Sequence, residues 1–253
     1  MKRARHTLFV CLLIIACDQL TAQTTEHEKA AIAANERGVA LFQSQQYESA
    51  VEAFELATKL DPKLGPAYNN LGVAYNSLGH HKDAIKVLKR ATQLAADYAE
   101  AHYNLGVAFQ SLGRRHEAID AYHRAIALKP DLAQAYNSMG VVLDDEGQHK
   151  RAVQVYLEAI RIHPNYAEAY NNLGTSNAQS GDYEQALRNF ERAINLKPDL
   201  AIGYYNIGVV ALRLRRRDVA VGQYRVLTSL DSALAVKLYN GIYEGKVLAL
   251  RIR

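Results

Sequence analysis

The sequence repeats itself every 34 residues, and this period constrains the fold more than any other feature. One phase of the repeat always carries a glycine, and an alanine follows each glycine twelve residues later. The glycines are Gly38, Gly72, Gly106, Gly140, Gly174 and Gly208, and the alanines are Ala50, Ala84, Ala118, Ala152, Ala186 and Ala220. Six units therefore occupy residues 31–234, with boundaries at 31–64, 65–98, 99–132, 133–166, 167–200 and 201–234.

The unit at residues 65–98 indicates what each repeat forms. Apolar residues recur at helical spacing on both sides of Gly79, as Tyr68, Leu71 and Tyr75 before it and Ala84, Leu88 and Ala91 after it. Two such stripes separated by a glycine predict two helices joined by a turn. Prolines that end the second helix stand at Pro62, Pro130, Pro164 and Pro198. Each unit is therefore predicted to be a helical hairpin.

The recurrent glycine needs a packing reason, because a glycine inside a helix costs about 1 kcal/mol relative to alanine. Close approach of the two helices in each hairpin supplies that reason. We expect large side chains of the second helix to fill the space beside the glycines, namely Phe54, Leu88, Tyr122, Tyr156, Phe190 and Tyr224.

The whole pattern resembles the tetratricopeptide repeat family. The resemblance is carried by aromatic-x-x-Leu-Gly-x-x-aromatic, followed by Ala, aromatic, Ala and Pro, and it covers residues 31–234. It implies an all-α fold, a right-handed α-solenoid of six helix-turn-helix repeats whose first helices line a concave groove. It implies binding of proteins and no reaction.

The first 22 residues predict a secretory signal peptide. A basic head precedes an uncharged apolar run, residues 8–16, that is too short to cross a bilayer as a stable helix. The head consists of Lys2, Arg3 and Arg5. The chain's two cysteines, Cys11 and Cys17, both lie in this segment, so the rest of the chain can form no internal disulfide.

The leader contains two candidate cleavage sites. Residues 14–17 (Ile-Ile-Ala-Cys) resemble a bacterial lipobox, in which Cys17 is acylated and anchors the chain to a membrane. Residues 20–22 (Leu-Thr-Ala) resemble an ordinary signal peptidase site. Both predict an exported protein, either periplasmic or a membrane-anchored lipoprotein of the cell envelope.

The segments that flank the repeats predict different structures. Residues 23–30 are polar and predict a short tether. Residues 235–253 predict a capping helix followed by a basic tail, because Leu234, Leu238 and Ile242 recur at helical spacing. Gly241 and Gly245 weaken the far end of that helix, so the last eight or so residues are expected to fray.

Charge is distributed unevenly along the chain, whose formal net charge is +4. Residues 23–200 carry 18 Lys and Arg against 22 Asp and Glu, whereas residues 201–253 carry 9 against 3. The densest cations are Arg213, Arg215, Arg216 and Arg217, at a helix end where they also complement the helix dipole. This basic end suits an anionic partner or lipid headgroups. Aromatic residues are not interleaved with these basic residues, so the sequence predicts no nucleic-acid partner.

The candidate binding residues come from the sixth position of each unit, which faces the concave side by family analogy. Those positions hold Glu36, Asn70, Asn104, Ser138, Asn172 and Asn206. An asparagine offers both a donor and an acceptor, so a row of them can satisfy the backbone of an extended peptide. The row is similar to that of the glycosyltransferase that attaches N-acetylglucosamine to intracellular proteins. Three residues further on, an apolar line consists of Val39, Val73, Val107, Val141 and Val209, broken by Thr175.

Three carboxylates oppose the helix dipole at the end of the fourth unit's first helix. They are Asp144, Asp145 and Glu146. A basic ligand, a divalent cation, or solvent together with Lys150 and Arg151 would compensate them, and we expect the solvent account to hold. The histidines are scattered without ligand spacing, so no metal site and no cofactor is predicted.

No enzyme signature is present in the sequence, since it has no phosphate-binding glycine loop and no strand pattern to carry a nucleophile. We therefore expect a non-catalytic interaction scaffold that binds an extended peptide or a partner protein in its groove. The alternative is a structural or self-assembling envelope protein that docks through its charged ends and leaves the groove unused.

Overall fold

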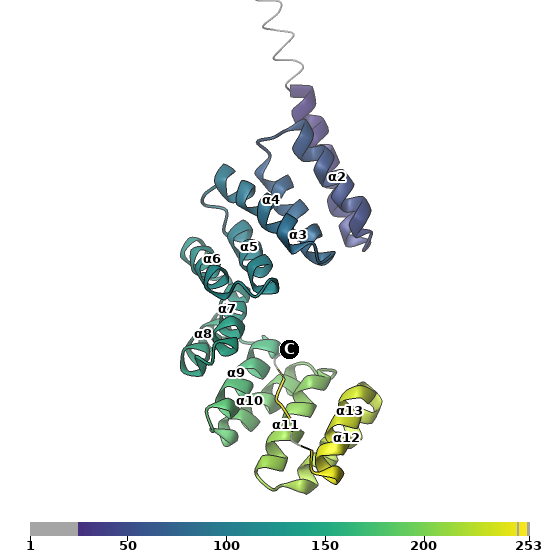
Figure 1. Ribbon diagram of the computed structural model, residues 1–253, viewed down its shortest axis with the longest axis vertical. Helices are drawn as coiled ribbons and strands as arrows, with labels where there is room; N and C mark the ends of the chain where they lie inside the picture. The colour runs from purple at the N-terminus through teal and green to yellow at the C-terminus, as the bar shows by residue number, and fades with distance from the viewer. Residues whose placement is uncertain (1–24, 247, 252–253) are drawn as a thin grey trace, which may run out of the picture. The chain divides into compact units, whose positions relative to one another are not determined.

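The computed structural model describes residues 25–246 and 248–251, and the regular structure in these residues is helical (Figure 1). The predicted signal peptide and Cys17 lie outside the described residues. The chain divides into two compact units, one ending at Glu117 and the other beginning at Ala118.

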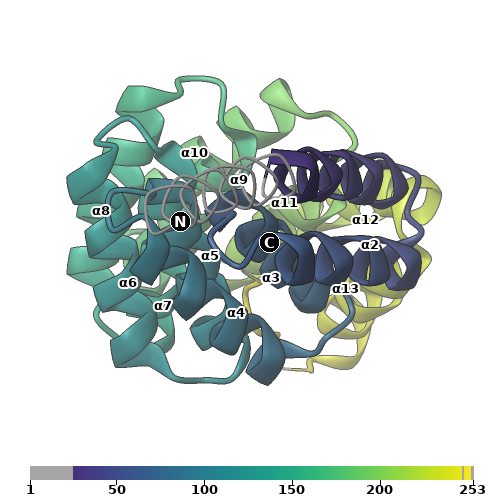
Figure 2. The same cartoon turned by 90° about the horizontal axis from the view of Figure 1, so that it is seen from above.

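Unit 1 consists of consecutive helices that pack on their neighbours in sequence (Figures 1 and 2). A helix over residues 25–43 is followed by α2 (Tyr47–Leu60), α3 (Gly65–Ser77), α4 (His81–Leu94) and α5 (Ala99–Ser111). Helix α3 packs against α2, α4 and α5, so the first helices of successive hairpins lie against each other. Helix α6 (Arg115–Leu128) begins at the end of this unit and continues into unit 2.

Unit 2 continues the same alternation of first and second helices. Its helices are α7 (Ala133–Asp145), α8 (His149–Ile162), α9 (Ala167–Gln179), α10 (Tyr183–Leu196), α11 (Ala201–Arg213), α12 (Arg217–Leu230) and α13 (Ser232–Glu244). The first helices α7, α9 and α11 begin at intervals of 34 residues and pack against each other. The sequence period is therefore the structural period.

The recurrent glycines bring the two helices of a hairpin together. A Cβ atom added to Gly140 would lie 2.5 Å from Cε1 of Tyr156, and one added to Gly174 would lie 2.6 Å from Cε1 of Phe190. Real Cβ atoms do not approach carbon atoms so closely, so only glycine fits. The predicted pairs Gly38–Phe54, Gly72–Leu88, Gly140–Tyr156 and Gly174–Phe190 are confirmed.

The sixth glycine packs against a different residue from the one predicted. A Cβ atom on Gly208 would lie 2.6 Å from Cδ2 of Leu238, which belongs to α13, so the expected contact with Tyr224 is wrong. Tyr224 instead faces Tyr239, with ring centroids 5.7 Å apart. The reason is that α13 covers the last hairpin and places its own leucine over the glycine.

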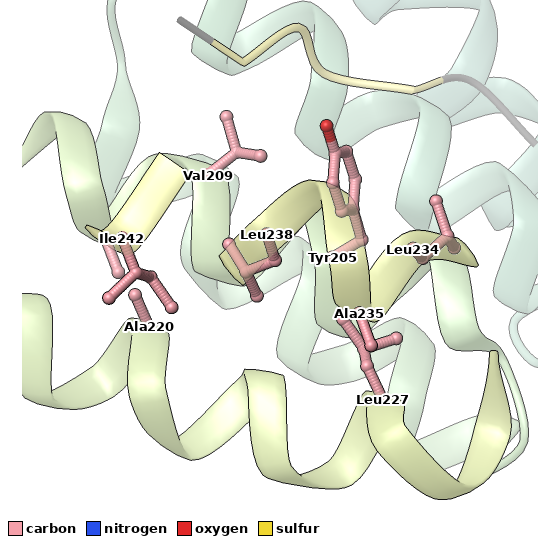
Figure 3. Close-up of a cluster of buried hydrophobic side chains, with 9 residues drawn as sticks. Tyr205, Val209, Ala220, Leu227, Leu234, Ala235, Leu238 and Ile242 are labelled. Carbon is pink, nitrogen blue, oxygen red and sulfur yellow. The ribbon is translucent and has the colours of Figure 1, made fainter. Parts of the chain in front are cut away.

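Helix α13 is the predicted capping helix, and it packs on α11 and α12. Leu234, Leu238 and Ile242 are buried in one cluster with Val209 and Leu227 (Figure 3). The cap therefore buries the apolar face that the last hairpin cannot cover by itself.

The turn between the two helices of each hairpin contains a residue in the left-handed backbone conformation. Glycines at φ between 70° and 88° fill this position as Gly79, Gly113, Gly147 and Gly181. Gln45 and Arg215 occupy the equivalent position at φ 60° without being glycine. A side chain there costs roughly 1–2 kcal/mol, so the first and last hairpins carry the strained turns.

The two segments that flank the repeats differ from their predictions. Residues 25–30 of the expected tether are helical and exposed, because they continue the first helix. Fraying is also the wrong prediction for residues 248–251. Gly245 ends α13 at φ 65°, and Leu248 and Leu250 then pack against the buried cluster around α11. The prediction of fraying considered only the local effect of the two glycines on helix stability, whereas the packing that orders this segment is tertiary.

Two glycine substitutions test the packing account. We expect Gly140→Ala to lower the urea midpoint of unfolding, because about 1–3 kcal/mol of overpacking exceeds the gain in helix propensity. The control is Gly222→Ala in α12, where no atom lies within 4 Å of an added Cβ. That control should raise the midpoint by the equivalent of about 1 kcal/mol. Equal shifts in both variants would contradict the account.

Candidate peptide-binding groove

The predicted asparagine row is bonded to a second row that the sequence analysis missed. In unit 1, Asn70 Nδ2 donates to Asn35 Oδ1 at 3.0 Å, and Asn104 Nδ2 donates to Asn69 Oδ1 at 2.8 Å. Each acceptor stands at the fifth position of the preceding repeat, so each bond ties one first helix to the next. The signal was present in the sequence, because asparagine recurs at this position at Asn35, Asn69, Asn137 and Asn171.

Unit 2 has the same bonded asparagine pairs between successive first helices, which we call the asparagine ladder, and there the pairs are buried. Asn172 Nδ2 donates to Asn137 Oδ1 at 3.1 Å, and Asn206 Nδ2 donates to Asn171 Oδ1 at 3.0 Å. Asn171, Asn172 and Asn206 are all 0% exposed. These asparagines thus tie neighbouring first helices together. The same residues cannot be replaced without a stability cost, since a buried partner would be left unpaired.

Exposure separates the predicted site residues into two groups. The residues of unit 1, which are Asn70, Val73, Asn104 and Val107, are partly exposed. The residues of unit 2, which are Ser138, Val141, Asn172, Asn206 and Val209, are buried. The groove face of unit 1 is therefore open, whereas that of unit 2 is covered.

The open part of the groove contains a hollow of about 200 Å³. Val39, Val73 and Asn70 line it together with Phe42, Gln43 and Phe54. The apolar line and the amide row predicted from the sequence meet in this hollow. It offers aliphatic surface beside a side-chain amide, which suits a largely neutral extended segment.

The covered groove face of unit 2 holds residues near the chain's own C-terminal end. The Arg251 backbone N–H donates to Asn206 Oδ1 at 2.9 Å, and Asn206 Nδ2 donates to the Arg251 carbonyl oxygen at 2.7 Å. Thr175 Oγ1 and Asn171 Nδ2 donate to the same carbonyl at 3.3 and 3.4 Å. One asparagine therefore satisfies both backbone groups of one extended residue.

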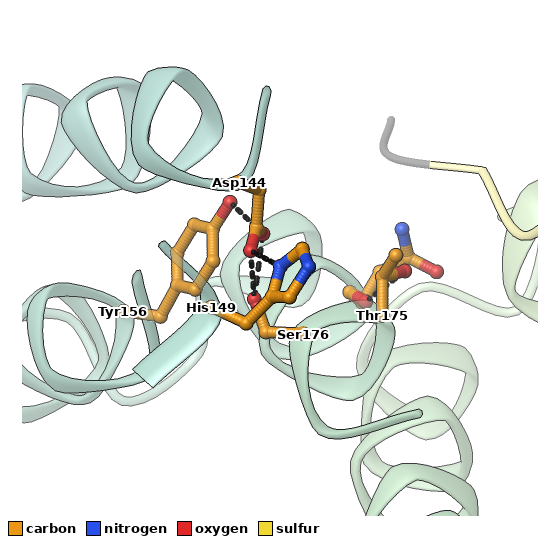
Figure 4. Close-up of polar contacts among 6 residues, drawn as sticks. Asp144, His149, Tyr156, Thr175 and Ser176 are labelled. Carbon is orange, nitrogen blue, oxygen red and sulfur yellow. Dashed lines mark hydrogen bonds and ion pairs between the residues drawn. The ribbon is translucent and has the colours of Figure 1, made fainter. Parts of the chain in front are cut away.

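Asp144 is compensated by protein donors, so the expected solvent account is wrong for this carboxylate. It is 6% exposed and accepts from Ser176 Oγ at 2.6 and 2.7 Å, from the Tyr156 hydroxyl at 3.1 Å and from His149 Nδ1 at 2.9 Å (Figure 4). Tyr156 and His149 lie on α8 and Ser176 lies on α9. The cluster thus ties the fourth repeat to the fifth.

Burial raises the pKa of Asp144, while hydrogen bonds from Ser176, His149 and Tyr156 act in the opposite direction. The Ser176 hydroxyl bonds to both carboxylate oxygens, and the cluster joins α7, α8 and α9. The arrangement is a structural tie. Among the described residues, no group of three or more His, Cys, Asp or Glu side chains is placed to hold a metal ion.

Family comparisons agree with the geometry. A model described as TPR repeat matches residues 38–79, 74–113, 145–181 and 176–214, and one described as Tetratricopeptide repeat matches residues 99–132. Together the matches cover more than half of the chain. The chain belongs to the tetratricopeptide repeat family. No curated protein matches it.

Solved structures of other tetratricopeptide repeat proteins are similar to this one. The crystal structure of MamA is 32% identical, covers 64% of this chain and 94% of its own, and has a TM-score of 0.58. YrrB, described as a TPR protein with an unusual peptide-binding site, is 23% identical over 78% of this chain and 97% of its own, with a TM-score of 0.57. PilW, a type IV pilus biogenesis factor, is 21% identical over 79% and 92%, with a TM-score of 0.73.

These comparisons identify the fold as an all-α tetratricopeptide repeat solenoid. Tetratricopeptide repeat proteins are generally non-catalytic interaction scaffolds that bind proteins or peptides. In the part of the chain that the structure describes, no helix combines the length and the apolar character needed to cross a membrane.

Ser176→Ala tests the buried carboxylate cluster. At neutral pH we expect the free energy of unfolding to fall by about 1–3 kcal/mol, because a buried acceptor loses its donor. Loss of the donor also raises the folded-state pKa of Asp144 further, so the folded variant binds a proton more tightly than the wild type does. The deficit should therefore shrink as the pH falls into the acid range.

Urea titrations at several pH values measure this effect. Ser180→Ala is the matched control, because Ser180 lies one helical turn further along the chain and is exposed. A deficit in Ser176→Ala that stays constant with pH would contradict a role for the charged carboxylate.

Proposed function

We propose that this protein is a non-catalytic scaffold that binds an extended peptide segment of a partner protein in its groove. The observation that carries the proposal is the contact between Asn206 and both backbone groups of Arg251, at 2.9 and 2.7 Å. A side chain that binds main-chain groups holds an extended segment whatever its sequence. The asparagines of the ladder thus have the chemistry that peptide capture requires.

Unit 1 is the part of the groove that is free to receive a partner. Its hollow of about 200 Å³ combines Val39, Val73 and Asn70, and these residues are partly exposed. A preformed groove avoids the cost of ordering a site on binding. The similarity to YrrB, described as having an unusual peptide-binding site, supports the proposal.

We propose further that the protein acts in the cell envelope. The basic head and apolar run of residues 1–22 support export, as does the similarity to PilW, a pilus biogenesis factor. Mass spectrometry of the mature N-terminus separates the two forms of this proposal. An acylated Cys17 indicates membrane anchoring, and a free Gln23 indicates a diffusing periplasmic protein. An intact leader in the mature protein would contradict export.

A second candidate function is self-assembly, and the outer face of α13 favours it. Val236, Tyr239 and Tyr243 are 58%, 42% and 50% exposed there, although they lie on an otherwise packed helix. Arg217 lies over the Tyr243 ring at 5.0 Å and gives this face a basic edge. In this alternative the face docks another copy of the chain and the groove is unused.

The same substitution at two valines separates the two candidates. A display library of random short peptides is selected against the full chain, and the affinity of the recovered peptides is then measured for the variants. We expect Val73→Lys to weaken binding by about tenfold or more, because it places a charge in an apolar hollow. Val236→Lys is the matched control and should bind these peptides as the wild type does.

Sedimentation of the same proteins measures their oligomeric state and so tests the self-assembly alternative. Wild-type oligomers that dissociate in Val236→Lys, with no peptide binding that depends on Val73, would favour self-assembly and contradict the proposed function.

A further inference from the structure

The C-terminal residues lie on unit 2 as an extended peptide would. Leu248 and Leu250 are partly buried, whereas Ala249 and Arg251 are exposed. Alternation with a period of two is the signature of an extended segment with one face on a surface. The chain therefore presents two leucines to the groove and turns the intervening residue to solvent.

Leu248, the first leucine, packs into the space left by Gly241, which has no side chain. A Cβ atom on Gly241 would lie 2.9 Å from Cγ of Leu248 and 3.2 Å from Cδ1 of Leu212. A hollow of about 220 Å³ lies beside this contact, and its lining includes Val209, Leu212 and Leu248. Gly241 thus has a packing role, and its cost to α13 is offset by the space it leaves for Leu248.

The second leucine joins the buried core of the unit. Leu250 packs against the cluster that contains Tyr205 and Val209, and also against the cluster that contains Leu187 and Val210. Val209 belongs to the first of these clusters and also lines the hollow beside Leu248. Of the predicted apolar line, Val209 therefore belongs to the surface on which the segment packs.

The residue after the second leucine, Arg251, is held by its main chain. Its backbone is bonded to Asn206 as described above, and Figure 3 shows the Tyr205 hydroxyl pointing toward the C-terminal segment. The Arg251 charge lowers the pKa of Tyr205, against a larger increase caused by burial. Arg251 also lines one hollow of about 440 Å³ with Asp199, Asp231 and Lys197, so charges of both signs surround it.

We infer that the groove of unit 2 recognises extended peptides with two aliphatic residues separated by one residue, holding the next residue by its main chain, and that residues 248–251 occupy this groove as a ligand in cis. A partner with this pattern must displace the chain's own segment. This inference rests on the proposed function and adds to it a partner class and a mode of regulation.

Tethering explains why a short segment occupies the groove. A segment joined to its site by a short linker has an effective concentration in the millimolar range, so four residues suffice in cis. The apparent affinity for a partner falls in proportion to the fraction of molecules in which the groove is free. Loosening the segment therefore increases partner binding without any change in the groove.

A single backbone donor is the most specific point at which to test this. Proline at position 251 removes the N–H that Asn206 accepts and leaves the groove unaltered. The probe is a fluorescein-labelled peptide with the sequence of residues 246–253, KVLALRIR, and its binding to the full chain is followed by anisotropy. We expect Arg251→Pro to bind this peptide about tenfold or more tightly than the wild type, as loss of one hydrogen bond with an unpaired buried partner predicts.

Two further variants serve as controls. Ala249→Pro introduces the same residue into the same segment, where the side chain is exposed and no backbone bond is present among the described residues. It should bind the peptide as the wild type does. Adding Asn206→Ala to Arg251→Pro should abolish the gain, with circular dichroism used to verify that the helices remain folded.

Equal affinity of Arg251→Pro and the wild type for the peptide, or no binding to either, would overturn the inference. Residues 248–251 would then be only a fixed cover of the apolar face, and Arg251→Pro would lower thermal stability alone. This failure is distinguishable from failure of the proposed function, because the latter is read in unit 1 through Val73→Lys and with unrelated peptides. Peptide binding that depends on Val73, without exchange of the C-terminal segment, would contradict the inference and support the scaffold.

Discussion

The structure depends on the contact between a large side chain of one helix and the bare backbone of another. At Gly140 and Gly174 this contact leaves no room for even one additional carbon atom, because Tyr156 and Phe190 lie within 2.6 Å of where it would stand. Close approach aligns the two helices of each hairpin and fixes the direction in which the next hairpin packs. First helices then lie side by side, and their fifth and sixth positions meet as bonded asparagine pairs. The groove follows from this packing and needs no separate design.

Much of the fold could be predicted from the sequence, because a repeated unit states each contact several times. The glycine phase predicted the hairpins, and the first helices begin at the intervals that the period requires. The predictions that were wrong concern the ends of the array, where the period stops. Tyr224 was expected over Gly208, but Leu238 of the cap takes that place. Residues 248–251 were expected to fray, yet tertiary packing of Leu248 and Leu250 outweighs the local effect of two glycines.

The candidate site was predicted in outline and differs in its chemistry. Asn70, Asn104, Asn172 and Asn206 were expected to bond to the backbone of an extended peptide, and in the structure each also donates to an asparagine of the preceding repeat. A sequence pattern gives the position of a polar residue but not its bonding partner, because the partner depends on the offset between neighbouring helices. The Asp144 cluster was missed for the same reason, since its donors come from two other helices. Its burial could not be foreseen from a run of three acidic residues.

The central claim is that a ladder asparagine holds an extended main chain in the groove, and amide hydrogen exchange at Arg251 tests it most directly. The account predicts that the Arg251 amide of the full chain exchanges more slowly than the Ala249 amide, since only the former donates to Asn206 among the described residues. It also predicts that Asn206→Ala removes this protection. Exchange of both amides at the rate of an unstructured chain, in the wild type, would contradict the claim.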